Sequence, residues 1–451
     1  MLPTLLSLQN DLAEGRTTSV ALTEAALARI DDTQGEGTRA FTKVYREQAL
    51  AAAQASDLLR AAGLVRSPVD GLPISIKDLF DVAGDTTPAG SKVLEGAEPA
   101  HENAVIVQRL LSAGAVIVGR TNMSEFAFSG LGLNPHYGTP SSPWDRATGR
   151  IPGGSSSGAG VSVADGMAAA AIGTDTGGSV RIPSAFCGLT GFKPTAARVP
   201  TQGALPLSWT LDSIGPLAAS VACCAILDAL LSGTVYRAPV APPLDHLRLA
   251  SISAISLAGA DEHVTQTYRS TLDALESQGA VIEEISLPEF GELPHINHLG
   301  GFAGAESWAW HRQLLAEHAA EYDPRVSARI ARGQAMNAAD YIDLQRLRPQ
   351  WITAVETRLC GYDALLMPTV PVTAPAIADV AASDDAYFAA NGLILRNSTY
   401  INFLNGCALS LPCHAAGTAP VGLMVAGCAN TDAHILGVGQ ALEGVLARIR
   451  G

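Results

Sequence analysis

Basic residues, long apolar runs and paired cysteines are all scarce in this sequence. There are 29 Lys and Arg against 43 Asp and Glu, which gives a formal net charge of -14. A surplus of negative charge repels polyphosphate backbones and anionic membrane surfaces. We therefore expect neither a nucleic acid nor a membrane as a partner.

The seven cysteines form no C-x-x-C pair and their number is odd. This pattern is not that of a disulfide framework, so we expect reduced, mostly buried thiols. No uninterrupted apolar run has the length of a membrane helix. The first residues lack a basic segment and a small-residue cleavage site, so we expect no signal peptide. These features together predict a cytoplasmic protein.

Motifs for a metal, a phosphate or a catalytic thiol are also missing. The pair His295 and His298 lacks the H-E-x-x-H pattern and a clear third ligand, which favours ordinary core or surface histidines. No Gly-rich segment ends in the Gly-Lys-Ser/Thr of a phosphate-binding loop. Cys413 and His414 are neighbours in sequence, which does not establish a nucleophile and base in space. We expect no metal and no cofactor.

What the chain does contain is a large apolar core in an alternating pattern of helices and strands. Its 451 residues are 47% hydrophobic and 16% charged, as in a globular protein. No repeat or long linker divides it, which predicts one domain over residues 1–451, with a helical amino-terminal layer at 1–65, a core at 70–220 and a helical cap at 288–350. Apolar spacing predicts helices over 4–14, 18–30, 46–63, 102–113, 158–165, 219–231, 264–278 and 432–448, and strands near 74–77, 115–118, 168–172, 248–252, 281–285, 365–368, 408–412 and 421–425.

The segment 149–184 holds two Gly-rich elements, GGSSSG at 153–158 and TDTGGS at 174–179. Consecutive glycines let backbone N–H groups converge on a ligand, and serines beside them can act as nucleophiles. An isolated Gly/Ser run is usually a flexible linker. Here apolar residues flank both elements, which favours a site inside the core.

Lys77 ends a short predicted strand in which Ile74 and Ile76 share one face. A lysine considered alone is usually a solvated surface residue. Its place after Ile74 and Ile76, together with the two serine elements, instead favours a lysine within the site. A lysine can take a proton only when neutral, and burial lowers its pKa in that direction.

Taken together, GLPISIKD, GGSSSG and GTDTGGSVRIPS resemble the amidase signature family, and the resemblance extends over most of the chain. It implies an α/β fold with a large mixed, twisted sheet covered by helices on both faces. It also implies Ser179 as nucleophile, Ser155 as a bridging serine after a cis peptide bond, and Lys77 as base. Further matching segments are GRTNMSEF at 119–126, GLTGFKP at 188–194, DSIGP at 212–216 and PVGL at 420–423.

The resemblance implies that backbone N–H groups stabilise the oxyanion of the reaction, as such donors commonly do; these belong to Thr176, Gly177, Gly178 and Ser179. Asp175 and Arg181 flank the nucleophile, and we expect them to brace its loop as an ion pair rather than to act on substrate. Ser156 is expected either to hydrogen-bond within the site or to cap a turn.

The hypothesis is a hydrolase that converts a small carboxamide to a carboxylate and ammonia or an amine through an acyl-enzyme. Ser157 and Ser142 stand where the family often has Gly and Asn, which leaves the subgroup open. The alternatives are the A subunit of a glutamyl-tRNA amidotransferase, a carbamate or urea hydrolase, and a non-catalytic binding protein. Segments 123–136 and 290–350 are expected to wall the substrate pocket. Family members are often homodimers, and the sequence leaves the oligomeric state open.

Overall fold

Eleven strands form one continuous sheet in the computed structural model, which describes residues 2–450. Their order across the sheet is β1-β3-β2-β4-β6-β5-β10-β11-β9-β7-β8. Parallel and antiparallel pairs are mixed, because β2 runs parallel to β3 and β4 while β4 is antiparallel to β6. The strands are β1 Phe41–Val44, β2 Pro73–Lys77, β3 Val116–Thr121, β4 Ala170–Asp175, β5 Thr190–Lys193, β6 Ser213–Ala218, β7 Arg248–Ser251, β8 Val281–Glu284, β9 Ala364–Pro368, β10 Cys407–Pro412 and β11 Gly422–Gly427.

Helices cover both faces of this sheet. The α-helices are α1 Leu5–Ala13, α2 Ser19–Ile30, α3 Gly37–Ala40, α4 Arg46–Ala61, α5 Val105–Ser112, α6 Ser157–Ala164, α7 Arg181–Phe186, α8 Val221–Ser232, α9 Ser253–Ser256, α10 Glu262–Ser277, α11 Pro288–Ile296, α12 Gly301–His318, α13 Pro324–Ala331, α14 Ala338–Leu359, α15 Ile377–Ala381, α16 Asp384–Phe403 and α17 Asp432–Arg450. Short 3-10 turns are η1 Glu125–Ala127, η2 Ala196–Arg198, η3 Leu244–His246, η4 Ala319–Glu321 and η5 Arg332–Ala335.

Strand β10 shows how the two faces acquire separate cores. Cys407, Leu409 and Leu411 belong to the core beneath α8 and α17, whereas Ala408 belongs to the core beneath α11 and α14. Successive side chains of a strand point to opposite faces, so a strand with apolar residues at nearly every position must be covered twice. The expected fold class, a large mixed sheet with helices on both faces, is therefore confirmed.

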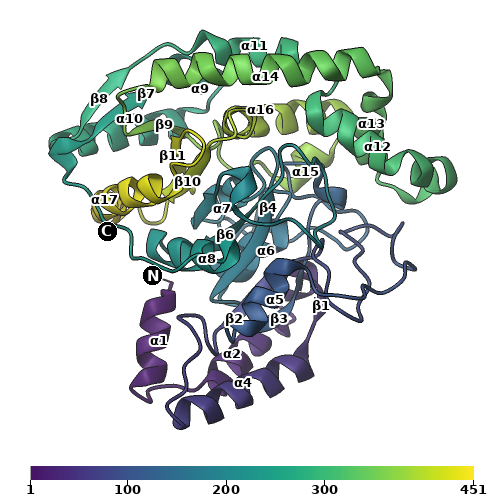
Figure 1. Ribbon diagram of the computed structural model, residues 1–451, viewed down its shortest axis with the longest axis vertical. Coiled ribbons are helices and arrows are strands. Elements are labelled where there is room, and N and C mark those ends of the chain that lie inside the picture. Colours follow the sequence, from purple (N-terminus) through teal and green to yellow (C-terminus); the bar gives the residue numbers. More distant parts are fainter. Residues whose placement is uncertain (1, 451) are drawn as a thin grey trace.

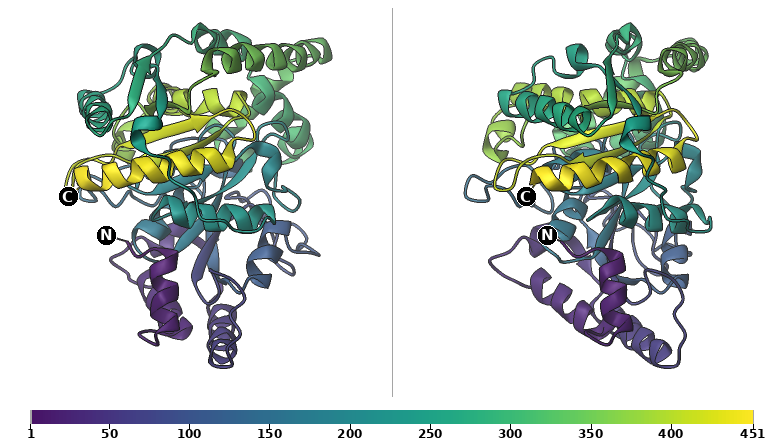
Figure 2. Two further views of the ribbon diagram at one scale, coloured as in Figure 1. Left: turned by 60° about the vertical axis from the view of Figure 1, so that its left-hand side comes forward. Right: turned by 90° about the vertical axis from the view of Figure 1, so that its left-hand side faces the viewer.

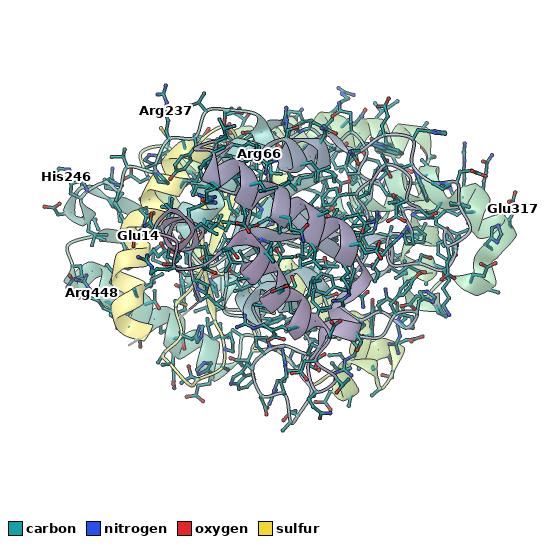
Figure 3. All side chains as sticks on the ribbon, turned by 90° about the horizontal axis from the view of Figure 1, so that it is seen from below. Glu14, Arg66, Arg237, His246, Glu317 and Arg448 are labelled. Atoms are coloured by element: carbon teal, nitrogen blue, oxygen red, sulfur yellow. The ribbon has the colours of Figure 1, made fainter. Side chains whose placement is uncertain are left out.

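The ends of the molecule are helical (Figure 1). Helices α1, α2 and α4, purple in the figure, lie at one end of the sheet, and α12 to α14, in green, lie at the other. Figure 2 shows α17 running along β10 and β11, against which it packs. Seen from the end that carries the amino-terminal helices, charged side chains such as Arg237, His246 and Glu317 project outward at the periphery (Figure 3).

Most elements lie where the sequence predicts them, but α16, the short helices α3, α7, α9 and α15, and three strands, β1, β5 and β6, were not predicted. Helix α16 buries the polar side chains Asn391, Asn397 and Asn402 together with its apolar ones, so it lacks a clear apolar stripe. Among the helices of residues 2–450, none combines the length and apolar character that a membrane span requires. Five of the seven cysteines are buried, as expected. The division into domains stays a prediction, which the continuity of the sheet supports.

Candidate active site

Lys77 lies at the carboxyl end of β2, and its neighbour β4 ends in the second Gly-rich element. The two strands are parallel and Ile76 pairs with Ile172, so both strands end at the same edge of the sheet. This register brings the Lys77 ammonium group 2.8 Å from the hydroxyl of Thr174. Lys77 and the loop 174–179, about a hundred residues apart in sequence, thus meet at one edge of the sheet.

The first Gly-rich element is a buried turn and not a linker. Every residue from 151 to 163 is buried, and α6 begins at Ser157. A Cβ atom on Gly158 would lie 2.1 Å from the carbonyl oxygen of Ala40, so only glycine permits this close contact. The peptide bond between Gly154 and Ser155 is cis.

This turn places the Ser155 hydroxyl 2.7 Å from Nζ of Lys77. Both side chains are fully buried. The backbone N–H of Ser156 donates to the carbonyl oxygen of Ser179 over 3.4 Å, which holds the first Gly-rich element against the second. Three residues predicted to act together, Lys77, Ser155 and Ser179, therefore lie in one region.

Burial lowers the pKa of Lys77 to about 7, although the carboxylates of Asp212 and Asp175 raise it. The cause is desolvation, because the charged amine loses its hydration and gains only partial compensation from two anions. A substantial share of Lys77 is therefore neutral near pH 7, as a general base requires.

Asp175 and Arg181 form a completely buried ion pair with a shortest distance of 2.9 Å. Burial alone would raise the pKa of Asp175, but the charge and hydrogen bonds of Arg181 hold it below its usual range. The Arg181 guanidinium also donates to the Ser398 carbonyl and to Asn402 Oδ1. The pair thus connects the loop 174–179 to α16, and the supporting role of Asp175 and Arg181 stays a prediction.

The backbone N–H groups of the loop 174–179 differ in whether they already make a hydrogen bond. Asp175 Oδ1 accepts the N–H of Gly178 at 2.9 Å, so this donor is already used. In the described residues no acceptor faces the N–H groups of Thr176, Gly177 and Ser179. Three of the four predicted donors are therefore free to point at a substrate oxygen.

The serines beside Ser155 bond to backbone groups. The Ser156 hydroxyl donates to the Thr174 carbonyl at 3.4 Å and makes no cap bond at the start of α6, which favours the intra-site role over the capping role. The Ser157 hydroxyl donates to the carbonyl of Asn122 at 3.3 Å.

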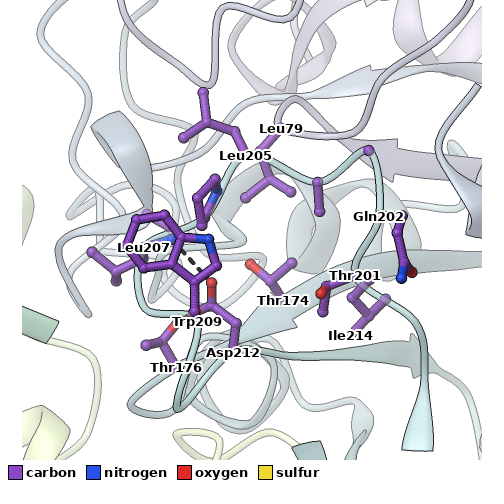
Figure 4. Close-up of a pocket in the computed structure, with 14 residues that line it drawn as sticks. Leu79, Thr174, Thr176, Thr201, Gln202, Leu205, Leu207, Trp209, Asp212 and Ile214 are labelled. Carbon is purple, nitrogen blue, oxygen red and sulfur yellow. Dashed lines mark hydrogen bonds between the residues drawn. The ribbon is translucent and has the colours of Figure 1, made fainter. Parts of the chain in front are cut away.

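Two cavities flank the loop 174–179 and share Ala127, Thr176 and Leu207. One, of about 300 Å³, is lined by Thr174, Thr176, Asp212 and Trp209 among others; Figure 4 shows the Trp209 indole beside Asp212 and Thr176. The other, of about 170 Å³, reaches Ser179 and Gly177 and extends to α12 and α13. Both segments expected as pocket walls contribute residues to it.

A family model described as Amidase matches residues 21–436. The chain belongs to the amidase signature family. Members are hydrolases that act on C–N bonds, and this chain is therefore an enzyme of that class.

The names of the relatives of this amidase describe different activities. It is 35% identical to the A subunit of the glutamyl-tRNA(Gln) amidotransferase of Chloroflexus aggregans, over 96% of this chain and 94% of that protein. It is 34% identical to the 2-amino-5-chloromuconic acid deaminase of Comamonas testosteroni, over 89% of this chain and 87% of the other. A solved structure described as an amidase superposes with a TM-score of 0.88 at 33% identity, covering 99% of this chain and 100% of that one.

Sequence reasoning about this amidase missed two polar groups, Thr174 and Asp212. Thr176 donates to Asp212 Oδ1 over 2.5 Å, and the N–H groups of Leu207 and Ser208 donate to Oδ2. Burial raises the pKa of Asp212 to about 6, against these hydrogen bonds and the charge of Lys77, which lower it. Asp212 begins the DSIGP segment, and this was the signal that could have identified it.

The histidine and thiol candidates lie outside this arrangement. His295 and His298 are exposed and stack with ring centroids 5.7 Å apart, and His298 Nδ1 contacts the His295 carbonyl. The Cys413 thiol donates to the carbonyl of Val421 over 3.4 Å. Neither lines the two cavities beside Ser179.

Proposed function

We propose that this amidase hydrolyses a small-molecule carboxamide by itself, through Ser179, Ser155 and Lys77 and without metal or organic cofactor. The observation that carries the proposal is the 2.7 Å contact between Lys77 Nζ and Ser155 Oγ, in a buried setting that lowers the pKa of the lysine. A buried amine that is partly neutral can accept a proton from a serine hydroxyl.

In the proposed reaction Ser155 passes its proton to Lys77 and takes the proton of Ser179, whose Oγ then attacks the amide carbon. The negative charge on the carbonyl oxygen is stabilised by the N–H groups of Thr176, Gly177 and Ser179. The loss of one such donor typically lowers the rate about 10²- to 10³-fold. Gly178 is left out because Asp175 accepts its N–H.

Collapse of the tetrahedral intermediate breaks the C–N bond, and the proton held by Lys77 returns through Ser155 to the leaving nitrogen. The product is an acyl-enzyme on Ser179 together with ammonia or an amine. Water then attacks the ester, again with Lys77 as base, and releases the carboxylate. Atoms and charges balance without a further reactant.

A second candidate is supported by the 35% identity to the A subunit of an amidotransferase. Such a subunit would release ammonia from glutamine only within a complex. The deaminase relative, whose name refers to a small organic acid, supports the first candidate at a similar identity of 34%.

The test is the release of ammonia or amine by the purified chain from aliphatic amides, anilides, glutamine and aryl carbamates. We expect Ser179→Ala and Lys77→Ala to abolish turnover. Ser157→Ala is the matched control, since this buried hydroxyl is two residues from Ser155 and donates only to the Asn122 backbone in the described residues. Turnover that persists in Ser179→Ala would exclude the proposed nucleophile, and glutamine turnover that requires added partner proteins would favour the second candidate.

A further inference from the structure

The part of the Ser179 cavity wall that α12, α13 and η5 form carries positive charge, and we call this part the far end of the cavity. Its wall includes Arg329 on α13, Arg332 on η5 and the first turn of α12, whereas none of the described residues that line it is acidic. Its volume of about 170 Å³ is comparable to the roughly 150 Å³ of an engineered cavity that holds benzene. The space suits a small organic molecule that reaches from Ser179 to this end.

Arg329 is held in place but not neutralised. Its Nη1 donates to the Phe128 carbonyl at 2.5 Å, and the guanidinium lies 4.4 Å from the centre of the Phe128 ring. A guanidinium has five N–H donors, and this is the single hydrogen bond it makes within residues 2–450. In the same residues no Asp or Glu forms an ion pair with Arg329 or Arg332. Burial lowers the pKa of Arg329 to about 10, so it remains charged near pH 7.

The amino end of α12 adds backbone donors to the same wall. Gly304 is the first residue whose N–H bonds back into the helix, to the carbonyl of Gly300. Among the described residues, the N–H groups of Gly301, Phe302 and Ala303 make no hydrogen bond, and Gly300 has no side chain to cap them. The Asn297 Oδ1 atom lies close to Gly301. Unpaired N–H groups and the helix dipole make such an end attractive to an anion.

A close contact between two glycines packs η5 against the first turn of α12. A Cβ atom on Gly333 would lie 2.0 Å from the Gly304 carbonyl oxygen, so the backbone after Arg332 packs directly on the first turn of α12. The backbone that carries Arg332 is thereby held against the helix end, and the Arg332 guanidinium donates to the carbonyl oxygen of His298 over 3.3 Å. A planar carboxylate fits this arrangement, because a guanidinium and backbone N–H groups can each bind one of its oxygens.

We propose that the far end of the cavity binds a carboxylate of the substrate, which makes the substrate class an amide with a free carboxylate, such as the monoamide of a short dicarboxylic acid. This inference rests on the proposed hydrolysis at Ser179. Glutamine also carries a carboxylate, but its ammonium group would lie near two arginines with no acidic residue in the cavity wall to neutralise it. The cavity therefore selects against glutamine.

The experiment compares three primary amides of similar size: glutaramate, its methyl ester and glutamine. We expect kcat/KM of the full chain for glutaramate to exceed each of the others by at least about tenfold, the scale of one charge-assisted hydrogen bond. Arg329→Met should reduce the ratio of glutaramate to ester by about tenfold or more, and Arg329→Lys should restore part of it. Arg325→Met is the matched control, because this arginine lies one helical turn earlier, pairs with Asp384 and should leave the ratio unchanged.

Binding of glutarate, measured by calorimetry, separates this inference from the proposed function. We expect the Ser179→Ala protein to bind glutarate and the Ser179→Ala/Arg329→Met protein to bind it at least about tenfold more weakly. Glutarate binding without turnover of any amide would disprove the hydrolysis but keep the carboxylate site. Turnover with equal rates for glutaramate and its ester, or an equal loss of both in Arg329→Met, would overturn the carboxylate site alone.

Discussion

Two buried lysines end two strands of the same sheet, and they differ in the groups that surround them. Lys77 ends β2 and contacts the hydroxyls of Ser155 and Thr174, whereas Lys193 ends β5 and donates to the carbonyls of Pro194 and Gly406. Burial lowers the pKa of both, to about 7 and about 8, although Asp175 raises each of them. Hydroxyls can give and take protons, and carbonyls can only accept hydrogen bonds.

The comparison indicates that burial lowers the pKa of a lysine but does not by itself make the lysine catalytic. A hydroxyl neighbour gives Lys77 a route by which a proton can leave. Lys193 has carbonyl neighbours that keep its ammonium form in place, and it joins β5 to the turn before β10. We expect a chemical role for the first and a structural role for the second.

Replacing each lysine by methionine should separate these roles most strongly. We expect Lys77→Met to lower kcat by about 10⁴-fold with the fold retained, since a positioned base contributes up to this factor. Lys193→Met should retain activity per folded molecule but lose about 2–5 kcal/mol of stability, because two buried carbonyls lose their donor. Urea unfolding and initial rates on the same samples measure both. Full activity in Lys77→Met would remove the basis of the comparison.

Asp175 raises the pKa of both lysines, so its replacement is the next test of the comparison. We expect Asp175→Asn to lower the free energy of unfolding by about 3–5 kcal/mol, since it leaves the Arg181 charge buried and unpaired. Because the pKa of Asp175 is depressed in the folded state, this contribution is present above the unfolded pKa of about 4 and is lost as pH falls below it.

The control for that variant is Asp165→Asn, which breaks a partly exposed pair with Arg146 and should cost about 1 kcal/mol or less. Unfolding midpoints at pH 7 compare the two. Equal losses would contradict a special role for the buried pair.

The pH dependence of activity should follow the pKa of Lys77. We expect kcat/KM to fall tenfold per unit below about pH 7 as the lysine becomes charged, and to level off above it. The carboxylate of Asp212 raises this pKa, so Asp212→Asn should move the acid limb to lower pH by about one unit. The same pKa shift also affects the free energy of unfolding. Between about pH 7 and 10 the unfolded lysine binds more protons than the folded one, so stability should rise with pH in this range. If the acid limb of the pH profile does not move in Asp212→Asn, the limb reports the titration of a group other than Lys77.

The smallest expected effect belongs to the second hydroxyl at Lys77. Thr174→Val removes one hydrogen bond of about 1 kcal/mol and should lower kcat about fivefold. Thr190→Val is the matched control, because its buried hydroxyl has no hydrogen-bond partner within residues 2–450 and its loss should leave both activity and stability unchanged. Equal effects of the two substitutions would show that Thr174 does not position the lysine.

The sequence predicted most helices with a clear helical periodicity, the strands formed by short apolar runs, and the residues that lie in local motifs. Ser155, Ser179 and Lys77 were predicted because the short segments around them, rich in small residues and hydroxyls, resemble motifs of the amidase signature family. Helix α16 was missed because its buried asparagines are satisfied by distant partners, such as Arg181 at Asn402, more than two hundred positions away. Contacts of this kind leave no periodic trace in the chain.

The same limit explains why Asp212 and Arg329 were not singled out as site residues. Asp212 acquires its raised pKa from loops that close over it, and Arg329 lies in a helix whose charged residues resemble an ordinary solvated face. Only the fold shows that the first faces Thr176 and the second faces the cavity of Ser179. The segment 290–350 was expected to line the pocket. The positive charge that it brings to the cavity wall was not predicted.

The proposed catalytic groups lie between residues 77 and 179, and the far wall of the cavity is built from residues 297–332. The two stretches line the same cavity although they are distant in the sequence. Substitutions in the second stretch can therefore alter which amide is accepted while the first stays intact. An enzyme built in this way can acquire a new substrate while its catalytic residues stay the same. We therefore expect sequence differences between relatives of different specificity to concentrate in α12 and α13.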